Sequence, residues 1–140
     1  MYHVTTIIDF SYGHRLLNYE GKCRHLHGHN GRVEIELASA RLDAREMVRD
    51  FGEVKQAIKG WIDETFDHKM LLRHDDPALP ALRQLGEALC IVQTNPTAET
   101  IAKLIFDQAK HLGFPVIAVR LWETDHSVAT YRGESVARGH

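Results

Sequence analysis

The spacing of apolar side chains along the chain predicts a strand pair at its N-terminal end. Residues 2–10 (YHVTTIIDF) are rich in β-branched and aromatic side chains, which favour a strand. Residues 30–38 (NGRVEIELA) alternate between apolar and polar side chains, as is typical of a half-buried strand. Turn residues between the two, at 18–21, predict a loop. We therefore expect the two strands to pair in an antiparallel manner.

Two amphipathic helices are predicted in the middle of the chain. Asp50 begins a capping box, and the apolar residues behind it recur at helical spacing, which predicts a helix over residues 51–65. The Asn95-Pro96 pair predicts the start of a second helix, as an N-cap followed by a proline at the first helical position. Gly113 predicts its end.

The remaining segments complete an α+β pattern. Residues 73–87, with prolines and acidic side chains, predict a loop, and residues 89–92 a short strand. Residues 115–123 and 127–131 predict two closing strands. Hairpin-like strand pairs separated by helices favour a four-stranded antiparallel sheet with two helices on one face. Such a sheet leaves its edges and one face uncovered, so we expect oligomerisation through the sheet.

Composition narrows the class of protein. The 140 residues fit a single domain, 1–140, with 44% hydrophobic and 26% charged residues as in ordinary globular proteins. The net charge of −2, without a basic block, argues against nucleic-acid binding. No apolar stretch approaches the roughly 20 residues that cross a membrane, and no signal peptide is recognisable. Two cysteines suit a reducing cytoplasm, so we expect a cytoplasmic protein. Ten histidines are the unusual feature.

The histidines near the first two strands form a candidate zinc site. His27 and His29 stand immediately before the second predicted strand, and residues i and i+2 of an extended chain project to the same side. His14 follows the first strand, and antiparallel pairing brings it alongside. An isolated H-x-H pair often arises by chance, but His14 strengthens this one. Three imidazoles with an open fourth position are typical of catalytic zinc, so we predict Zn²⁺ at these residues. His25 would share the side of His27 and His29 only if the strand began earlier, so we leave it out and expect it to be exposed or near bound phosphate.

Cys23 is a candidate base or nucleophile. Lys22 and Arg24 flank it, and neighbouring cations favour the reactive thiolate. A fourth zinc ligand and a cysteine that merely packs as a small hydrophobe are the alternatives. For Cys90, within the apolar run LCIV, simple packing is the better interpretation.

Three acidic positions add further candidates. Asp67 beside His68 can orient an imidazole for proton transfer, although such a pair often only ends a helix. Glu99 lies in the first turn of the second predicted helix, where the helix dipole alone accounts for it. Glu123 ends an apolar strand (RLWE), where it either faces solvent or binds a guanidine-like ring edge through two hydrogen bonds.

Six motifs in order give the chain a family resemblance. They are F-S-Y-G-H-R-L, C-x-x-x-H-G-H-N, V-x-D-F-G-x-V-K, F-D-H-K-x-L, N-P-T-A-E and W-E-T. Together they resemble the 6-pyruvoyltetrahydropterin synthase and 6-carboxytetrahydropterin synthase family from about Ile8 to Tyr131. The resemblance implies the tunnelling fold (T-fold). In that fold three subunits join their four-stranded sheets into a barrel, and two trimers stack into a homohexamer.

The resemblance also implies roles for individual residues. His14, His27 and His29 match the zinc ligands, and Cys23 matches the proton-abstracting cysteine. The pair Asp67 and His68 matches its catalytic partners, which can serve the Cys23 of a neighbouring subunit. Glu123 matches the carboxylate that anchors the pterin ring, and Thr97 and Glu99 match positions near the pterin.

Spacing within the motifs favours one branch of the family. The three residues between Cys23 and the H-G-H motif resemble the carboxy-forming bacterial branch. This implies conversion of 7,8-dihydroneopterin triphosphate to 6-carboxy-5,6,7,8-tetrahydropterin, with release of acetaldehyde and triphosphate, for the queuosine (7-deazaguanine) pathway. The chain departs from the family at Tyr12-Gly13, where small residues are common, and at Gly31, where an aromatic is common. Met70 and Asp125-His126 depart as well.

Three alternatives stay open. Two lie within the enzyme class: a 6-pyruvoyltetrahydropterin synthase that only eliminates triphosphate, and an aldolase-like activity on dihydroneopterin. The third is a non-catalytic, zinc-stabilised binding module, with Cys23 closing the ligand set. The chain has enough core to fold unaided, and no basic reading helix follows the motif, which disfavours the binding module.

Overall fold

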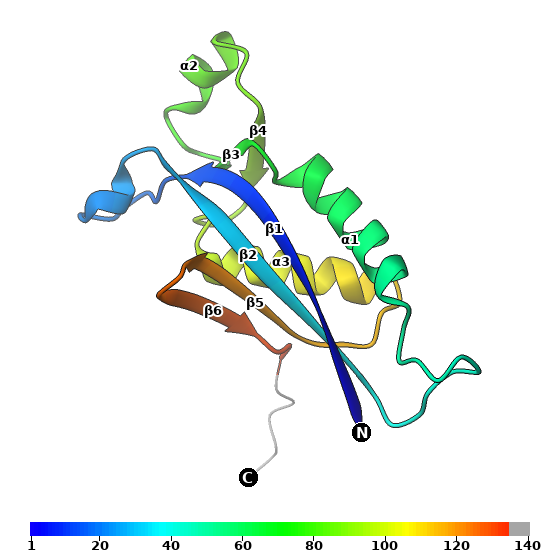
Figure 1. The fold of residues 1–140 in the computed structure, drawn as a ribbon. Helices are drawn as coiled ribbons and strands as arrows, with labels where there is room; N and C mark the ends of the chain where they lie inside the picture. Colours follow the sequence, from blue (N-terminus) through cyan, green and yellow to red (C-terminus); the bar gives the residue numbers. More distant parts are fainter. Residues whose placement is uncertain (135–140) are drawn as a thin grey trace.

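The computed structural model describes residues 1–134, which form a mixed sheet and three helices (Figure 1). The strands are β1 (Tyr2–His14), β2 (His27–Ser39), β3 (Lys69–Arg73), β4 (Leu89–Val92), β5 (Val116–Thr124) and β6 (Ser127–Tyr131). The helices are α1 (Phe51–Thr65), α2 (Leu79–Gln84) and α3 (Ala98–His111), and a 3₁₀ turn spans Lys22–Arg24.

The sheet has six strands in the order β4-β3-β1-β2-β5-β6. Four of them, β1, β2, β5 and β6, pair in an antiparallel manner, as the sequence predicted. The prediction of a four-stranded sheet was too low, because β3 and β4 extend the sheet: β3 pairs parallel to β1 and β4 parallel to β3. The predicted short strand at residues 89–92 is thus an edge strand of the same sheet.

Both long helices cover one face of the sheet, as predicted (Figure 1). On β1 the even-numbered residues from Thr6 to His14 are buried, whereas odd-numbered residues such as Asp9 face away from the helices. On β2 the odd-numbered residues from Gly31 to Leu37 are buried, since each strand alternates between the two faces. The helices contribute Val54, Ile58 and Ile62 from α1 and Ile101, Ala102 and Ile105 from α3 to this core.

The helix caps agree with the sequence at α1 and differ at α3. Asp50 caps α1 by accepting a hydrogen bond from the Gly52 amide at 2.7 Å. Helix α3 begins two residues later than predicted, with Thr97 as the N-cap. Asn95 cannot act as the cap because its side-chain amide binds both backbone groups of Leu17, in the loop between β1 and β2.

The segment between α1 and α3 contains two elements that the sequence did not reveal. Strand β3 follows α1 after only three residues, and its sequence KMLLR has no alternation to mark it. Helix α2 spans six residues inside the predicted loop. Both are short, so the local sequence signal is weak, and their positions depend on pairing and packing with distant residues.

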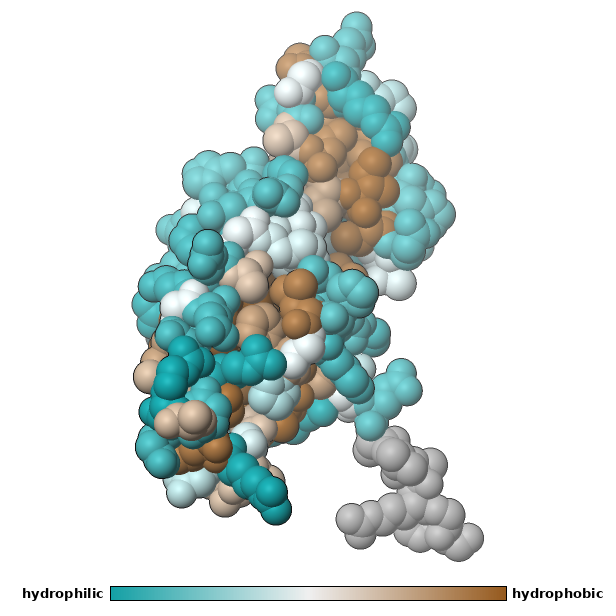
Figure 2. All heavy atoms as spheres, turned by 90° about the vertical axis from the view of Figure 1, so that its right-hand side faces the viewer, coloured by the Kyte–Doolittle hydropathy of each residue, from teal (hydrophilic) through white to brown (hydrophobic). Residues whose placement is uncertain are grey.

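One face and both edges of the sheet lack a covering layer among the described residues. The helix-free face carries polar and charged side chains, including the ion pair between Arg32 and Asp9. Figure 2 shows apolar side chains gathered in the upper half of another face, at the height of β3 and β4. Two exposed apolar residues belong to β4 and the end of α2: Ile91 is 41% exposed, and Leu85, which follows α2, is 74% exposed. No helix in the described part of the chain is long and apolar enough to cross a membrane.

Candidate functional site

Strand register brings three histidines together at one end of the sheet. His14 is the last residue of β1 and pairs directly with His27, the first residue of β2. His29 lies two residues further along β2, so all three imidazoles project to the helix-covered face. The ring centroids of His14 and His27 lie 4.5 Å apart, and His29 lies 5.0 Å from each. One ligand atom from each residue falls within 4.8 Å of the others, so the group could hold a metal ion.

Backbone carbonyls orient two of these imidazoles. His14 Nδ1 donates to the Pro96 carbonyl and His27 Nδ1 to the His25 carbonyl, each at 2.7 Å. Protonation at Nδ1 leaves Nε2 of each ring with a free lone pair, the form that binds a metal.

The spacing of these nitrogen atoms fits zinc. Nε2 of His14 and Nε2 of His29 lie 3.2 Å apart. Zinc–nitrogen bonds of 2.0–2.1 Å in a tetrahedral arrangement place neighbouring ligand atoms about 3.3 Å apart. Burial lowers the pKa of both His14 and His29 below the usual value of 6.5, which favours the neutral imidazole that a metal requires. Geometry and protonation therefore both suit a divalent metal.

Glu123 and Tyr12 adjoin the three histidines. One carboxylate oxygen of Glu123, on β5, lies 3.4 Å from Nε2 of His14 and 3.5 Å from Nε2 of His29. Tyr12 precedes His14 by two residues on the same face of β1, and its ring centroid lies 5.3 Å from that of His14. The side chain of Tyr12 is buried, and its hydroxyl has no hydrogen-bond partner among the described residues. From the sequence, Tyr12 was noticeable only as a departure from the family pattern.

Cys23 lies in the 3₁₀ turn of the loop that joins β1 to β2. The Leu16 amide donates to the Cys23 carbonyl at 2.9 Å, which draws the two limbs of this loop together. The Cys23 side chain is partly exposed. It does not belong to the group of potential metal ligands found within residues 1–134, which argues against its alternative role as a fourth ligand. The second cysteine, Cys90, lies in β4, and burial raises the pKa of its thiol.

Asp67 and His68 form a hydrogen-bonded pair that is tied to β1. The Ser11 amide donates to Asp67 at 2.9 Å, and the His68 amide donates to the Ser11 carbonyl at 2.7 Å. The Ser11 amide holds the pKa of Asp67 below its usual value. Asp67 in turn accepts a hydrogen bond of 2.8 Å from His68 Nδ1, so the imidazole, which is 81% exposed, keeps Nε2 free. His68 has a φ of 57°, an uncommon conformation outside glycine that often accompanies function.

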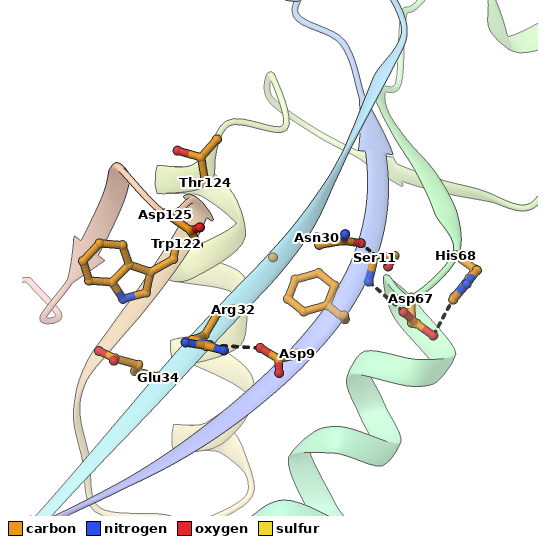
Figure 3. Close-up of a pocket in the computed structure, with 12 residues that line it drawn as sticks. Asp9, Ser11, Asn30, Arg32, Glu34, Asp67, His68, Trp122, Thr124 and Asp125 are labelled. Atoms are coloured by element: carbon orange, nitrogen blue, oxygen red, sulfur yellow. Dashed lines mark hydrogen bonds and ion pairs between the residues drawn. The ribbon is translucent and has the colours of Figure 1, made fainter.

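Two adjoining hollows meet at His68. The larger, of about 800 Å³, lies on the helix-free face (Figure 3), where Asp67, His68 and Trp122 contribute to its lining. The smaller, of about 400 Å³, includes His27, His29 and His68 in its lining. His68 therefore connects the hollow beside the histidine group with the open face of the sheet.

The remaining predicted site residues lie around the start of α3 and in the loop. Thr97 acts as the N-cap of α3 and accepts a hydrogen bond from the Thr100 amide at 3.2 Å. Glu99 is exposed in the first turn. His25 is exposed, as predicted, and receives a hydrogen bond from Arg24 at 3.2 Å. Neither Thr97 nor Glu99 lines the two hollows within this chain.

Fold and site together define a small α+β protein with three histidines, grouped at the end of its sheet, that could hold a metal ion. Comparison with known proteins makes the assignment specific: residues 3–134 match the sequence profile of the 6-pyruvoyl tetrahydropterin synthase family, to which this chain therefore belongs. The predicted family resemblance is confirmed, and with it a lyase-type enzyme of pterin chemistry.

Individual relatives agree with this assignment. The 6-carboxy-5,6,7,8-tetrahydropterin synthase of Rickettsia conorii is 38% identical, over 89% of this chain and 95% of that protein. A solved but uncharacterized protein of Wolinella succinogenes is 30% identical, with a TM-score of 0.80 over 95% of this chain and 98% of that one. The Caenorhabditis elegans 6-pyruvoyl tetrahydropterin synthase is 23% identical, with a TM-score of 0.72 over 95% and 96%. The predicted T-fold is confirmed.

Proposed function

We propose that this protein is a zinc-dependent 6-carboxytetrahydropterin synthase. It converts 7,8-dihydroneopterin triphosphate to 6-carboxy-5,6,7,8-tetrahydropterin and releases acetaldehyde and triphosphate, for 7-deazaguanine synthesis. The grouping of His14, His27 and His29 within 4.8 Å carries the metal part of the proposal. Relatives named 6-carboxy-5,6,7,8-tetrahydropterin synthase, which are 37–41% identical, support the choice of reaction.

The three histidines would hold zinc, which as a Lewis acid makes the side-chain hydroxyl protons of the substrate easier to remove. Cys23 acts as a thiolate, and its Sγ removes a proton from the substrate side chain. The loop that carries Cys23 leads directly into His27, so the base and the metal ligands belong to one short segment.

The Asp67–His68 pair moves a second proton. Asp67 holds His68 Nδ1 by a hydrogen bond, so His68 Nε2 is the atom that exchanges a proton with a hydroxyl oxygen of the substrate. The exposure of His68 and its place between the two hollows suit a residue that acts on a substrate bound between subunits.

Glu123 anchors the pterin ring, and the oligomer completes the pocket. The carboxylate accepts two hydrogen bonds from the guanidine-like edge of the ring. Its position beside the histidines suits a ring held next to the metal. Thr97 and Glu99 lie near the pterin at a subunit interface. The uncovered sheet edges and the apolar side chains near β4 support a homo-oligomer, which we propose to be a hexamer of two trimers.

The test is product analysis after incubation of the purified protein with 7,8-dihydroneopterin triphosphate, with and without a chelator. We expect acetaldehyde and the 6-carboxypterin, both lost on chelation and restored by zinc. Pyruvoyltetrahydropterin without acetaldehyde would assign the sister activity. Absence of any zinc-dependent product would refute the proposal.

Two cysteine variants test the catalytic assignment. Cys23→Ala should bind zinc and fold normally but lose turnover, because the proton-abstracting thiolate is gone. Cys90→Ala is the matched control, since Cys90 lies in β4 and should leave turnover intact. Full activity of Cys23→Ala would remove Cys23 from the mechanism.

A further inference from the structure

The buried hydroxyl of Tyr12 is a polar group that the proposed mechanism does not use. Tyr12 is only 3% exposed, and its hydroxyl is enclosed without a hydrogen-bond partner among the described residues. Buried polar groups are nearly always paired, because an unpaired one destabilises the fold. A phenylalanine would fill the same space without this cost. The hydroxyl therefore calls for an explanation beyond packing.

The position of Tyr12 places this hydroxyl among the site residues. Tyr12 pairs directly with His29 across the β1–β2 ladder, and the two ring centroids lie 5.6 Å apart. Gly31 makes room for the ring: a Cβ atom at residue 31 would lie 3.0 Å from Cε1 of Tyr12. In the family pattern a small residue is common at position 12 and an aromatic at position 31, whereas this chain has Tyr12 and Gly31. The two departures are thus one structural feature, because the aromatic ring comes from β1 instead of β2.

Glu123 is the hydrogen-bond acceptor that the hydroxyl can reach. Its carboxylate lies beside both imidazoles that flank Tyr12, 3.4 Å from His14 and 3.5 Å from His29. The phenol of a tyrosine is protonated at neutral pH, so its hydroxyl can act as a donor to this carboxylate. A carboxylate so near the histidines also has a competing orientation, toward the metal position.

We propose that Tyr12 is a positioning residue whose hydroxyl donates a hydrogen bond to Glu123 and holds that carboxylate toward the pterin ring. The inference rests on the proposed function, in which Glu123 binds the ring. The Glu123 carboxylate then has three neighbours: the imidazoles of His14 and His29 and the Tyr12 hydroxyl. Of these, the hydroxyl is the donor that directs the carboxylate away from the two histidines. Tyr12 thereby acts on the ring through Glu123 and needs no contact with the substrate.

A double-mutant cycle tests this role. The variants are Tyr12→Phe, Glu123→Gln and the two combined, and the probe is 7,8-dihydroneopterin, which carries the ring without the triphosphate. Its affinity for the zinc-loaded protein is measured by calorimetry, and zinc affinity is measured by chelator competition. Tyr131→Phe, on β6, is the matched control because it removes a tyrosine hydroxyl away from the site. A hydrogen bond to a charged carboxylate corresponds to about a tenfold change in affinity or more.

We expect Tyr12→Phe to weaken dihydroneopterin binding about tenfold in the wild-type background and not at all beside Glu123→Gln. Zinc affinity and the thermal unfolding temperature should be unchanged or slightly higher. Equal weakening in both backgrounds, no weakening, or loss of zinc in Tyr12→Phe would each overturn the inference. Failure of the proposed function is distinguishable, because the wild-type protein itself would then neither bind dihydroneopterin nor form product.

Discussion

Arg15 and Asp76 form a largely buried ion pair directly beside the three histidines. Arg15 follows His14, and its Nε donates to one Asp76 oxygen at 2.8 Å while a second guanidinium nitrogen donates to the other oxygen. The Asp76 side chain is completely enclosed, and the Ala78 amide is its other donor. Burial would raise the pKa of Asp76, but the donors from Arg15 and Ala78 outweigh it and hold the pKa below 3.8. The pair thus fixes the end of β1 to the segment before α2.

The cost of removing Arg15 can be estimated from this geometry. In Arg15→Met the side-chain stem is kept, but Asp76 loses two of its three donors. Leaving one charge of a buried pair without its partner typically costs about 3–5 kcal/mol. The carboxyl can instead take up a proton, which costs about 1.4 kcal/mol for each pH unit above its usual pKa of 3.8, or about 4.4 kcal/mol at pH 7. We therefore expect a loss of about 3–4 kcal/mol in the free energy of unfolding at pH 7.

The pH dependence of this destabilisation shows whether Asp76 takes up a proton when Arg15 is removed. In the wild-type protein the lowered pKa of Asp76 contributes stability above pH 3.8 that is lost as the pH falls below it. In Arg15→Met the proton costs only about 1.6 kcal/mol at pH 5, so the destabilisation should shrink to about that value. Urea unfolding at fixed protein and metal concentration measures both values. Arg32→Met, which breaks the exposed pair with Asp9, is the control and should cost less than about 1 kcal/mol. An equal loss at pH 7 and pH 5 would refute the reasoning.

Three further predictions follow from the site. Burial lowers the pKa of His14 and His29, so the metal-free protein should lose stability as the pH falls below 6.5; a urea midpoint that is unchanged between pH 7.5 and 5.5 would contradict this. Thr97→Ala should lower the free energy of unfolding by about 1 kcal/mol, since it removes the α3 cap, and Thr97→Ser should restore it; equal unfolding midpoints would exclude a capping role. Lys22 and Arg24 have no carboxylate partner among residues 1–134, so replacing both with alanine should raise the KM for the triphosphate substrate; an unchanged KM would exclude triphosphate binding.

The parts of the fold that were predictable have a local physical signal. Helix α1 has a side-chain cap and an apolar stripe, and its predicted bounds of 51–65 agree with the structure. Strand β2 alternates over most of its length, and its first three residues, His27 to His29, and its last residue, Ser39, were placed outside it. Strand β3 has neither signal. Its place beside β1 depends on the Ser11–His68 hydrogen bond, which joins residues 57 positions apart.

The site residues, too, were predictable only where the local sequence carries a signal. The H-x-H spacing and the strand prediction were enough to bring His14, His27 and His29 together on one face. The closeness of Glu123 to the imidazoles depends on the pairing of β5 with β2, and neither this nor the enclosed hydroxyl of Tyr12 could be predicted from local spacing. The family resemblance named Glu123 as a candidate, but it gave no role to Tyr12.

The grouping of the three histidines depends on strand register more than on the identity of the surrounding side chains. The groups that orient His14 and His27 are the backbone carbonyls of Pro96 and His25, which any residue at those positions supplies. Substitution of Pro96 or His25 should be tolerated as long as the backbone conformation at that residue is unchanged. A one-residue slip between β1 and β2 would instead separate His14 from His27, and an inserted residue would turn an imidazole to the opposite face. The long ladder of β1 and β2, with its buried alternate residues, resists such a slip and thereby keeps the three histidines together.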